Sequence, residues 1–118
     1  MTVLLVLVCS GFGAITRFGV DTLVQSRRLG EFPLGTLVVN TSGCFLLGLL
    51  AGLEPSHDTM LVIGTATVGS YTTFSTWMIE TQRPGEDGDR SLAWRNVILS
   101  LGFGLSAVAL GRAVGRLA

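Results

Sequence analysis

The sequence has 118 residues, of which 48% are hydrophobic and 14% charged, and its mean hydropathy is +0.61. Its eight basic residues balance its eight acidic ones, so the formal net charge is zero. This composition is too apolar for an ordinary soluble domain of this size and offers no basic surface for nucleic acid, so it indicates a small membrane protein.

Four apolar windows are long enough to cross a bilayer as helices, because a hydrocarbon core of about 30 Å needs about 20 helical residues. The first lacks the basic start and short core of a signal peptide, so we expect it to stay in the mature protein. Little chain is left over, which predicts an all-α membrane protein whose residues 1–118 form one transmembrane domain. The windows are residues 3–24, 33–53, 59–79 and 92–114.

The first window carries an arginine, Arg17, well past its middle. An arginine at the centre of a membrane helix costs about 2.5–3.5 kcal/mol unless it snorkels toward the headgroups or meets water. Two interpretations stay open: an anchor near one interface, or a positive charge at the mouth of an anion pathway. Asp21 lies four residues further on and could pair with Arg17 along one helix face.

The second window places an amide, Asn40, near membrane depth, where it needs a partner. It could join two helices, which typically contributes on the order of 1 kcal/mol, or it could present N–H donors to an anion. Gly48 and Gly52 are spaced four apart, as are Gly111 and Gly115 in the fourth window. This spacing of small residues predicts close packing between helices.

The third window contains a hydroxyl-rich stretch, residues 64–77, with seven Ser and Thr side chains. Gly64 and Gly69 weaken helix propensity, and hydroxyls compete for backbone groups, so we predict that this helix breaks between Gly69 and Thr72. Non-helical backbone survives at membrane depth only where it is buried in protein or lines a site. The break is therefore expected to face a pathway or a binding site.

Two aromatic residues follow the predicted break. Phe74 and Trp77 are three residues apart and should share one helix face, beside the hydroxyls of Thr73 and Thr76. Residues 80–90 are hydrophilic and are predicted to form a solvated loop.

The fourth window carries Asn96, Ser100 and Gly104 at intervals of four, which makes a small, polar stripe on one face. This stripe could face the third window, or it could simply let two helices approach each other.

Three blocks occur in order along the chain: GAITR at residues 13–17, GTLVVNTSGCFLLG at residues 35–48, and GSYTTFSTW at residues 69–77. Together they resemble the Fluc-type fluoride channels, the CrcB family. The second block matches the family pattern GTLxVNxxGxFxxG at every fixed position, and the resemblance covers essentially the whole chain.

The resemblance implies four transmembrane helices, with the third broken, that assemble as an antiparallel dimer in the cell membrane. Two pores would run along the subunit boundary and pass fluoride down its gradient, which lowers cytoplasmic fluoride. The implied partners are fluoride, the lipid bilayer, and a second subunit that is either another copy or a related chain.

The resemblance also implies roles for individual residues. Asn40 would line the pore and Arg17 would lie near a vestibule. Phe74 takes the first position of the family's pair of pore phenylalanines, whose positive ring edges are thought to meet the ion. The implied fluoride pathway comprises Arg17, Asn40, Thr73, Phe74, Trp77 and Ser100.

A sodium ion at the dimer centre is the implied cofactor. The backbone carbonyls of Gly69 and Thr72 from both subunits would hold it, since hard oxygen ligands suit such a cation.

Two residues depart from the family pattern. Trp77 stands where the family has its second pore phenylalanine, and Asn96 stands where it often has tyrosine. Trp keeps a ring edge and adds one N–H donor. These changes raise the alternative that the chain is one subunit of a heterodimeric fluoride channel.

Other functions stay open beside the fluoride channel. A small four-helix exporter would need a carboxylate inside the membrane, but the windows hold only Asp21, near an end, with Glu80 just beyond the third. A non-transporting accessory subunit is a further alternative. An enzyme is the weakest, because the windows contain no Ser/His/Asp or His/Cys cluster.

Overall fold

The computed structural model describes residues 1–27 and 30–118. Three of its helices are long and apolar enough to cross a membrane: α1 (Thr2–Ser26), α2 (Leu34–Leu53) and α6 (Arg90–Leu117). Between α2 and α6 the chain forms four shorter helices. They are α3 (His57–Thr59), the π-helix η1 (Met60–Val68), α4 (Gly69–Tyr71) and α5 (Ser75–Glu86).

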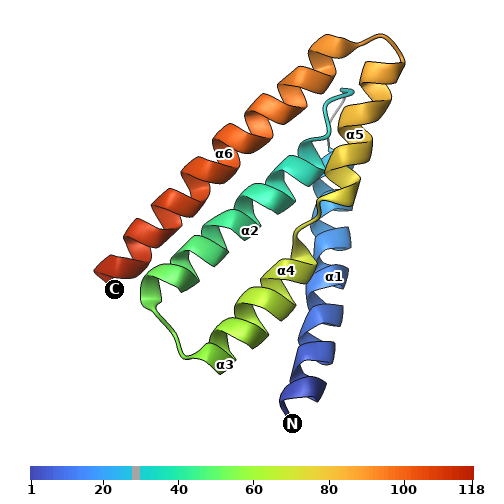
Figure 1. Ribbon diagram of the computed structural model, residues 1–118. Coiled ribbons are helices and arrows are strands. Elements are labelled where there is room, and N and C mark those ends of the chain that lie inside the picture. Colours follow the sequence, from blue (N-terminus) through green and yellow to red (C-terminus); the bar gives the residue numbers. More distant parts are fainter. Residues whose placement is uncertain (28–29) are drawn as a thin grey trace.

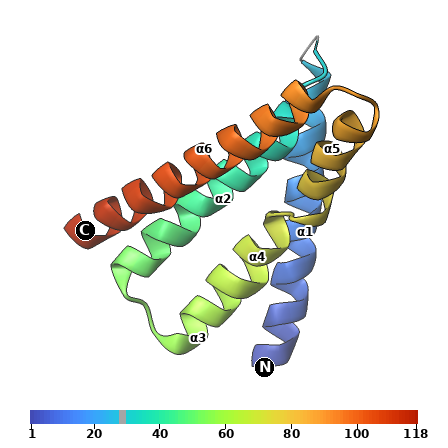
Figure 2. The same ribbon diagram turned by 45° about the horizontal axis from the view of Figure 1, so that its top comes forward.

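The helices run back and forth along one bundle (Figure 1). α1 leads away from the N-terminus, α2 returns, η1, α4 and α5 lead away again, and α6 returns to the C-terminus. Both termini therefore lie toward the same end of the bundle. The turned view shows α2 between α6 on one side and α1 on the other (Figure 2). The prediction of a tight first turn includes Arg28 and Leu29, which lie outside the described residues.

The contact between α2 and α6 is built on glycine. A Cβ atom at Gly48 would collide with the backbone of Val108, and one at Gly111 would collide with the carbonyl of Phe45. Removing side chains at these positions lets the two backbones touch, which is how small residues strengthen helix packing in a bilayer. The predicted packing role of the glycine pairs is confirmed.

The predicted helix break is present, and it begins at Thr72, the last residue of the predicted range. Gly69 keeps helical dihedral angles (φ −61°, ψ −38°), and α4 continues to Tyr71. Thr72 then becomes extended (φ −79°, ψ 161°), and a new helix begins at Ser75. Glycine at position 69 permits a break but does not require one. The break forms instead next to Thr73, whose backbone groups are hydrogen-bonded by Asn40 of α2.

The nine residues before α4, Met60–Val68, form a π-helix that the sequence did not reveal. Its wider turn is visible in the Thr67 hydroxyl, which donates to the Val62 carbonyl five residues back at 2.9 Å. This segment therefore departs from regular α-helical geometry before the chain leaves the helix at Thr72. Such π-helical turns are rare and occur mostly at functional sites.

The predicted loop at residues 80–90 is mostly wrong. α5 continues through Pro84 to Glu86, and only residues 87–89 connect it to α6. Pro84 is tolerated because it lies in the last turn, and its carbonyl accepts the Asp89 N–H at 2.7 Å. The Asp89 carboxylate accepts the Leu92 N–H at 3.0 Å and caps α6, so a polar composition here marks a short turn between helices.

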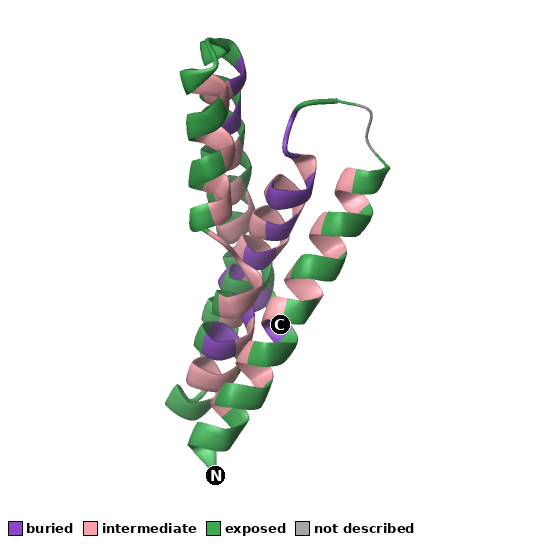
Figure 3. Ribbon diagram, turned by 90° about the vertical axis from the view of Figure 1, so that its right-hand side faces the viewer, coloured by how far each residue is buried: buried purple, intermediate pink, exposed green. Residues whose placement is uncertain are grey.

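Buried residues gather where the helices meet, whereas the outward faces are exposed (Figure 3). Many of the exposed side chains are large and apolar; Phe12, for example, is 66% exposed. The least exposed side chains are Val39, Thr36 and Asn96, of which two are polar. Apolar outside and partly polar inside is the pattern of a protein whose surroundings are lipid.

Candidate ion pathway

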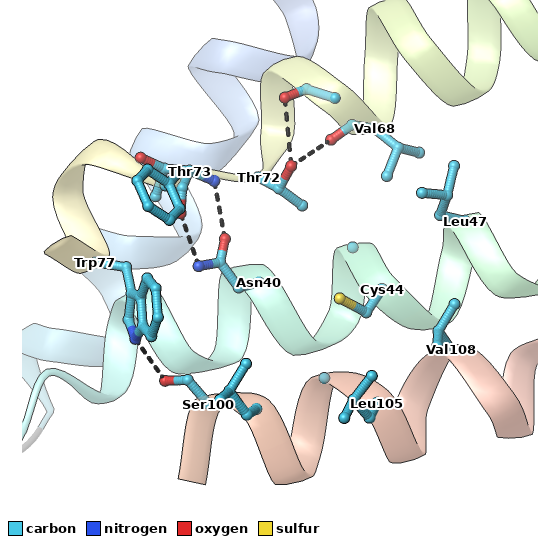
Figure 4. Close-up of a pocket in the computed structure, with 15 residues that line it drawn as sticks. Asn40, Cys44, Leu47, Val68, Thr72, Thr73, Trp77, Ser100, Leu105 and Val108 are labelled. Carbon is cyan, nitrogen blue, oxygen red and sulfur yellow. Dashed lines mark hydrogen bonds between the residues drawn. The ribbon is translucent and has the colours of Figure 1, made fainter. Parts of the chain in front are cut away.

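A cavity of about 420 Å³ opens between α2, the broken helix and α6 (Figure 4). Apolar side chains such as Leu47, Leu105 and Val108 form much of its wall. Five of the six predicted pathway residues also line it: Asn40, Thr73, Phe74, Trp77 and Ser100. Gly69 and Thr72, the predicted sodium ligands, lie on the same wall. The structure thus brings together residues from three separate windows.

Asn40, which lies on α2, stabilises the break in the third window through hydrogen bonds. Its Nδ2 donates to the Thr73 carbonyl at 2.8 Å, and its Oδ1 accepts the Thr73 N–H, also at 2.8 Å (Figure 4). A side-chain amide has a second N–H donor. One amide can therefore join the helices and still present a donor to the cavity, so the two roles left open for Asn40 are compatible.

The break releases the carbonyls predicted to hold sodium from helical N–H donors, although each still accepts from a side chain: Gly69 from the Thr72 hydroxyl and Thr72 from Arg17. The Thr73 N–H, which would bond the Gly69 carbonyl in a continuous helix, is used by Asn40. The Thr72 hydroxyl lies 3.2 Å from the Val68 carbonyl and 3.3 Å from that of Gly69. Neutral oxygens released from helical bonding, with Gly69 exposed, have the right chemistry for a hard cation, although one chain supplies only part of a coordination shell.

Phe74 and Trp77 form a tilted aromatic pair, as their spacing predicts. Their ring centroids are 5.6 Å apart, and the ring planes meet at 59°. Phe74 is 68% exposed, so its edge is available to whatever enters the cavity. Because the edge of an aromatic ring is electropositive, it can lie beside an anion.

A closed ring of four hydrogen bonds joins α5 to α6 behind this pair. The Trp77 indole N–H donates to the Ser100 hydroxyl at 2.9 Å, and Ser100 donates to Asn96 Oδ1 at 3.3 Å. Asn96 Nδ2 donates to the Thr81 hydroxyl at 2.8 Å, and Thr81 donates to the Trp77 carbonyl at 2.8 Å. The polar stripe on α6 therefore faces the broken helix, and both departures from the family pattern belong to one network.

Arg17 lies in a second cavity of about 250 Å³, and not in the first. Its guanidinium donates to the Thr72 carbonyl at 3.5 Å, where pairing with Asp21 was the expectation. Asp21 lines the same cavity, together with the hydroxyl-bearing residues Thr36 and Thr76. Thr73 lines both cavities. Arg17 therefore lies next to the break, and Thr73 separates its cavity from the first one.

Sequence reasoning missed the contacts of several polar residues on α2 and α5. Thr81 was assigned to a loop, although it completes the ring with Asn96. In the part of the chain that the structure describes, Thr36 Oγ1 and Glu80 Oε2 are buried without a hydrogen-bond partner. The signal that could have located Glu80 and Thr81 is their spacing of three and four residues, respectively, from Trp77, which continues its helix face.

A family model described as CrcB-like protein, Camphor Resistance (CrcB), matches residues 4–112. The chain belongs to the CrcB family. This match spans the first cavity from α2 to α6 and both halves of the broken helix. Membership of CrcB, together with three apolar helices of membrane-crossing length, makes the chain a multi-pass protein of the cell membrane.

Curated relatives of this CrcB chain share much of its sequence. "Fluoride-specific ion channel FluC 2" of Mycolicibacterium paratuberculosis is 50% identical over 107 residues, 91% of this chain and 88% of the relative. The protein of the same name from Mycobacterium tuberculosis is 47% identical over 112 residues, 95% and 89%. "Fluoride-specific ion channel FluC 1" of Rubrobacter xylanophilus is 41% identical over 113 residues, 94% and 90%. All three names are those of ion channels, not of enzymes.

Proposed function

We propose that this chain is a fluoride-specific ion channel through which fluoride leaves the cell passively, so that cytoplasmic fluoride falls. The observation that carries this proposal is the gathering of Asn40, Thr73, Phe74, Trp77 and Ser100 around one cavity between α2, the broken helix and α6. The names of the curated relatives supply the ion. They also favour a channel over an exporter or an accessory subunit.

The broken helix is the proposed fourth crossing of the membrane. η1 and α4 lead to the break, and α5 continues in the same general direction (Figure 1). The two termini at one end of the bundle support an even number of crossings. Backbone that leaves helical geometry at Thr72 would then lie inside the bilayer, where it must be covered by protein or must line a site.

A second, antiparallel subunit is the proposed cover for the first cavity. This cavity is open on one side, and the apolar faces around it are exposed in the single chain; Leu101 is 53% exposed and Leu105 67%. A partner there would turn an open groove into two enclosed pathways along the subunit boundary. The partner is another copy of this chain or a related one.

The same boundary would complete the sodium site. Gly69 and Thr72 lie on the open wall, so two subunits facing each other would contribute carbonyls from both breaks. The ion would supply positive charge to carbonyls that the break has released from helical N–H donors. Arg17 already contacts the Thr72 carbonyl, and thus provides part of that charge within one chain.

Anion passage would depend on the few donors that face the apolar wall. Asn40 has a second N–H, and Phe74 offers a positive ring edge. Arg17 would raise the local concentration of anions near the break through its charge. None of these groups is a carboxylate, which suits an anion pathway.

The decisive test is fluoride efflux from liposomes that contain only this polypeptide, followed with a fluoride electrode. Efflux would support a channel made of identical subunits. Efflux that appears only when a related chain is co-reconstituted would identify a heterodimer. Loss of chloride at an equal rate, or no efflux in either preparation, would overturn the proposed function.

A further inference from the structure

We propose that the hydrogen-bond ring of Trp77, Ser100, Asn96 and Thr81 is a latch, which a fluoride ion opens by taking the indole N–H away from Ser100. This inference rests on the proposed function. It assigns the selectivity of the pathway to a competition between two hydrogen-bond acceptors for one donor.

The ring uses every polar hydrogen of the Trp77 and Ser100 side chains. An indole has a single N–H, and it is donated to Ser100 at 2.9 Å. A serine hydroxyl has a single O–H, and it is donated to Asn96 at 3.3 Å. Both residues line the cavity, yet in the closed ring the Trp77 hydrogen is directed at Ser100 (Figure 4) and the Ser100 hydrogen at Asn96, and neither at the cavity.

An anion in this cavity therefore finds few donors while the ring is closed. The Thr73 N–H is used by Asn40, and the Thr72 hydroxyl is directed at the carbonyls of its own helix. The second N–H of Asn40 is left. Because a charge among apolar side chains must be hydrogen-bonded, the entering ion has to recruit a further donor. The Trp77 indole belongs to the lining of the same cavity.

When the indole N–H donates to the ion and no longer to Ser100, a charge-assisted hydrogen bond replaces a neutral one. Charge-assisted hydrogen bonds are roughly twice as strong. The gain depends on the acceptor, and fluoride is the strongest acceptor among the halides. Chloride is larger and accepts more weakly, so it displaces Ser100 less readily. The latch thus discriminates between ions by hydrogen-bond strength as well as by size.

Asn96 and Thr81 are positioning residues in this scheme. Asn96 is 1% exposed and lies behind Ser100, where it holds the hydroxyl so that an oxygen lone pair points at the indole. Thr81 anchors the other end of the Asn96 amide and returns the chain of bonds to the Trp77 carbonyl. Hydrogen bonds linked in this way polarise one another, so a weaker anchor loosens the latch.

The test follows the indole N–H of Trp77 directly by ¹H–¹⁵N NMR of ¹⁵N-labelled protein in micelles. The chain has two tryptophans, so Trp94→Phe leaves Trp77 as the single indole signal. Sodium fluoride and sodium chloride are titrated at equal sodium concentration. We expect fluoride to move the Trp77 resonance downfield and chloride to leave it in place.

Ser100→Ala removes the competing acceptor. We expect the half-saturating fluoride concentration to fall about fivefold, the equivalent of one neutral hydrogen bond, and chloride to begin to move the resonance. Thr81→Val, whose side chain is remote from the cavity, should act in the same direction but less strongly. It serves as the second variant if Ser100→Ala does not fold.

Two results would overturn the latch. One is a Trp77 resonance that fluoride does not move in protein whose vesicles still release fluoride, which leaves the proposed function intact. The other is weaker fluoride binding in Ser100→Ala, which would make Ser100 a ligand of the ion and not its competitor. Absence of both efflux and binding would instead remove the proposed function.

Discussion

Asn40 bonds both backbone groups of Thr73, although 33 residues separate them in the chain. Each bond is 2.8 Å long. The amide takes the place of the helical hydrogen bonds that the chain gives up at the break. A side chain of α2 is therefore part of the backbone structure of the neighbouring helix, and changes at Asn40 act on both.

Asn40→Asp is expected to abolish fluoride efflux. A carboxylate can accept the Thr73 N–H, but it cannot donate to the Thr73 carbonyl, and it places negative charge on the wall of the cavity. The carbonyl left unpaired should also lower the free energy of unfolding by about 1–3 kcal/mol. Efflux from liposomes and the unfolding midpoint check the two effects separately. Normal efflux from Asn40→Asp would confine Asn40 to holding the helices together.

Phe74→Ile is expected to reduce fluoride efflux sharply while the assembled protein stays intact, because it removes the ring edge and keeps apolar bulk. Phe12→Ile is the matched control, since Phe12 is 66% exposed on α1 and Phe74 is 68% exposed. Efflux and gel-filtration profiles of both variants provide the measurement. Unchanged efflux from Phe74→Ile would place this ring in the packing and not in the pathway.

Gly111→Ala is expected to destabilise the fold by about 1–3 kcal/mol, because its Cβ would collide with the Phe45 carbonyl and overpacking forces backbones apart. Gly102→Ala on the same helix is the control, since nothing lies within 4 Å of its added Cβ. Thermal unfolding followed by circular dichroism compares them. Equal midpoints for the two variants would contradict the close contact between α2 and α6.

Replacing sodium by a large organic cation is expected to weaken the dimer, and flux with it, in proportion to the sodium removed. The carbonyls of Gly69 and Thr72 would then face each other across the boundary without a positive ion between them. Subunit exchange between differently labelled samples measures the effect. A dimer indifferent to the exchange of cations would argue against the sodium site.

The orientation of the chain in the membrane is predicted from arginines near the ends of the helices. In the sequence, five lie in or beside the first and third connections between the predicted windows: Arg27, Arg28, Arg83, Arg90 and Arg95. Two lie at the other end: Arg112 and Arg116. Because positive flanks stay in the cytoplasm, we expect most copies to insert with both termini outside, and a partner of opposite bias to complete an antiparallel channel.

Single cysteines at positions 26 and 56 test this orientation, in a background that lacks Cys9 and Cys44. An impermeant thiol reagent applied to intact cells should label Ser56→Cys and spare Ser26→Cys. Equal labelling of both, combined with efflux from this polypeptide alone, would instead establish identical subunits in both orientations.

Sequence patterns predicted features that depend on local composition. The glycine spacing identified the contact between α2 and α6, and the aromatic spacing identified the pair of Phe74 and Trp77. Hydroxyls and glycines predicted that the third window breaks between Gly69 and Thr72, and the chain becomes extended at Thr72. That position depends on Asn40, which reaches Thr73 from another helix.

The features that composition could not reveal depend on contacts between elements. Polar residues after Trp77 were interpreted as a loop, whereas α6 provides Asn96 as a partner for Thr81 and the helix continues. The sequence identified Asn96 as part of a polar stripe, but it did not determine which helix this stripe faces. A buried amide follows its partners, and these are known only once the helices are packed.

The bond between Asn40 and Thr73 also has a consequence for the order in which the protein is made. A nascent chain that left helical geometry at Thr72 in lipid would expose unpaired backbone groups. Asn40, which bonds these groups, must therefore be present before the break forms. Asn40 leaves the ribosome 33 residues earlier than Thr73 and is therefore already available. At the elongation rate of about 5–20 residues per second, that lead is roughly two to seven seconds, which gives α2 time to insert first.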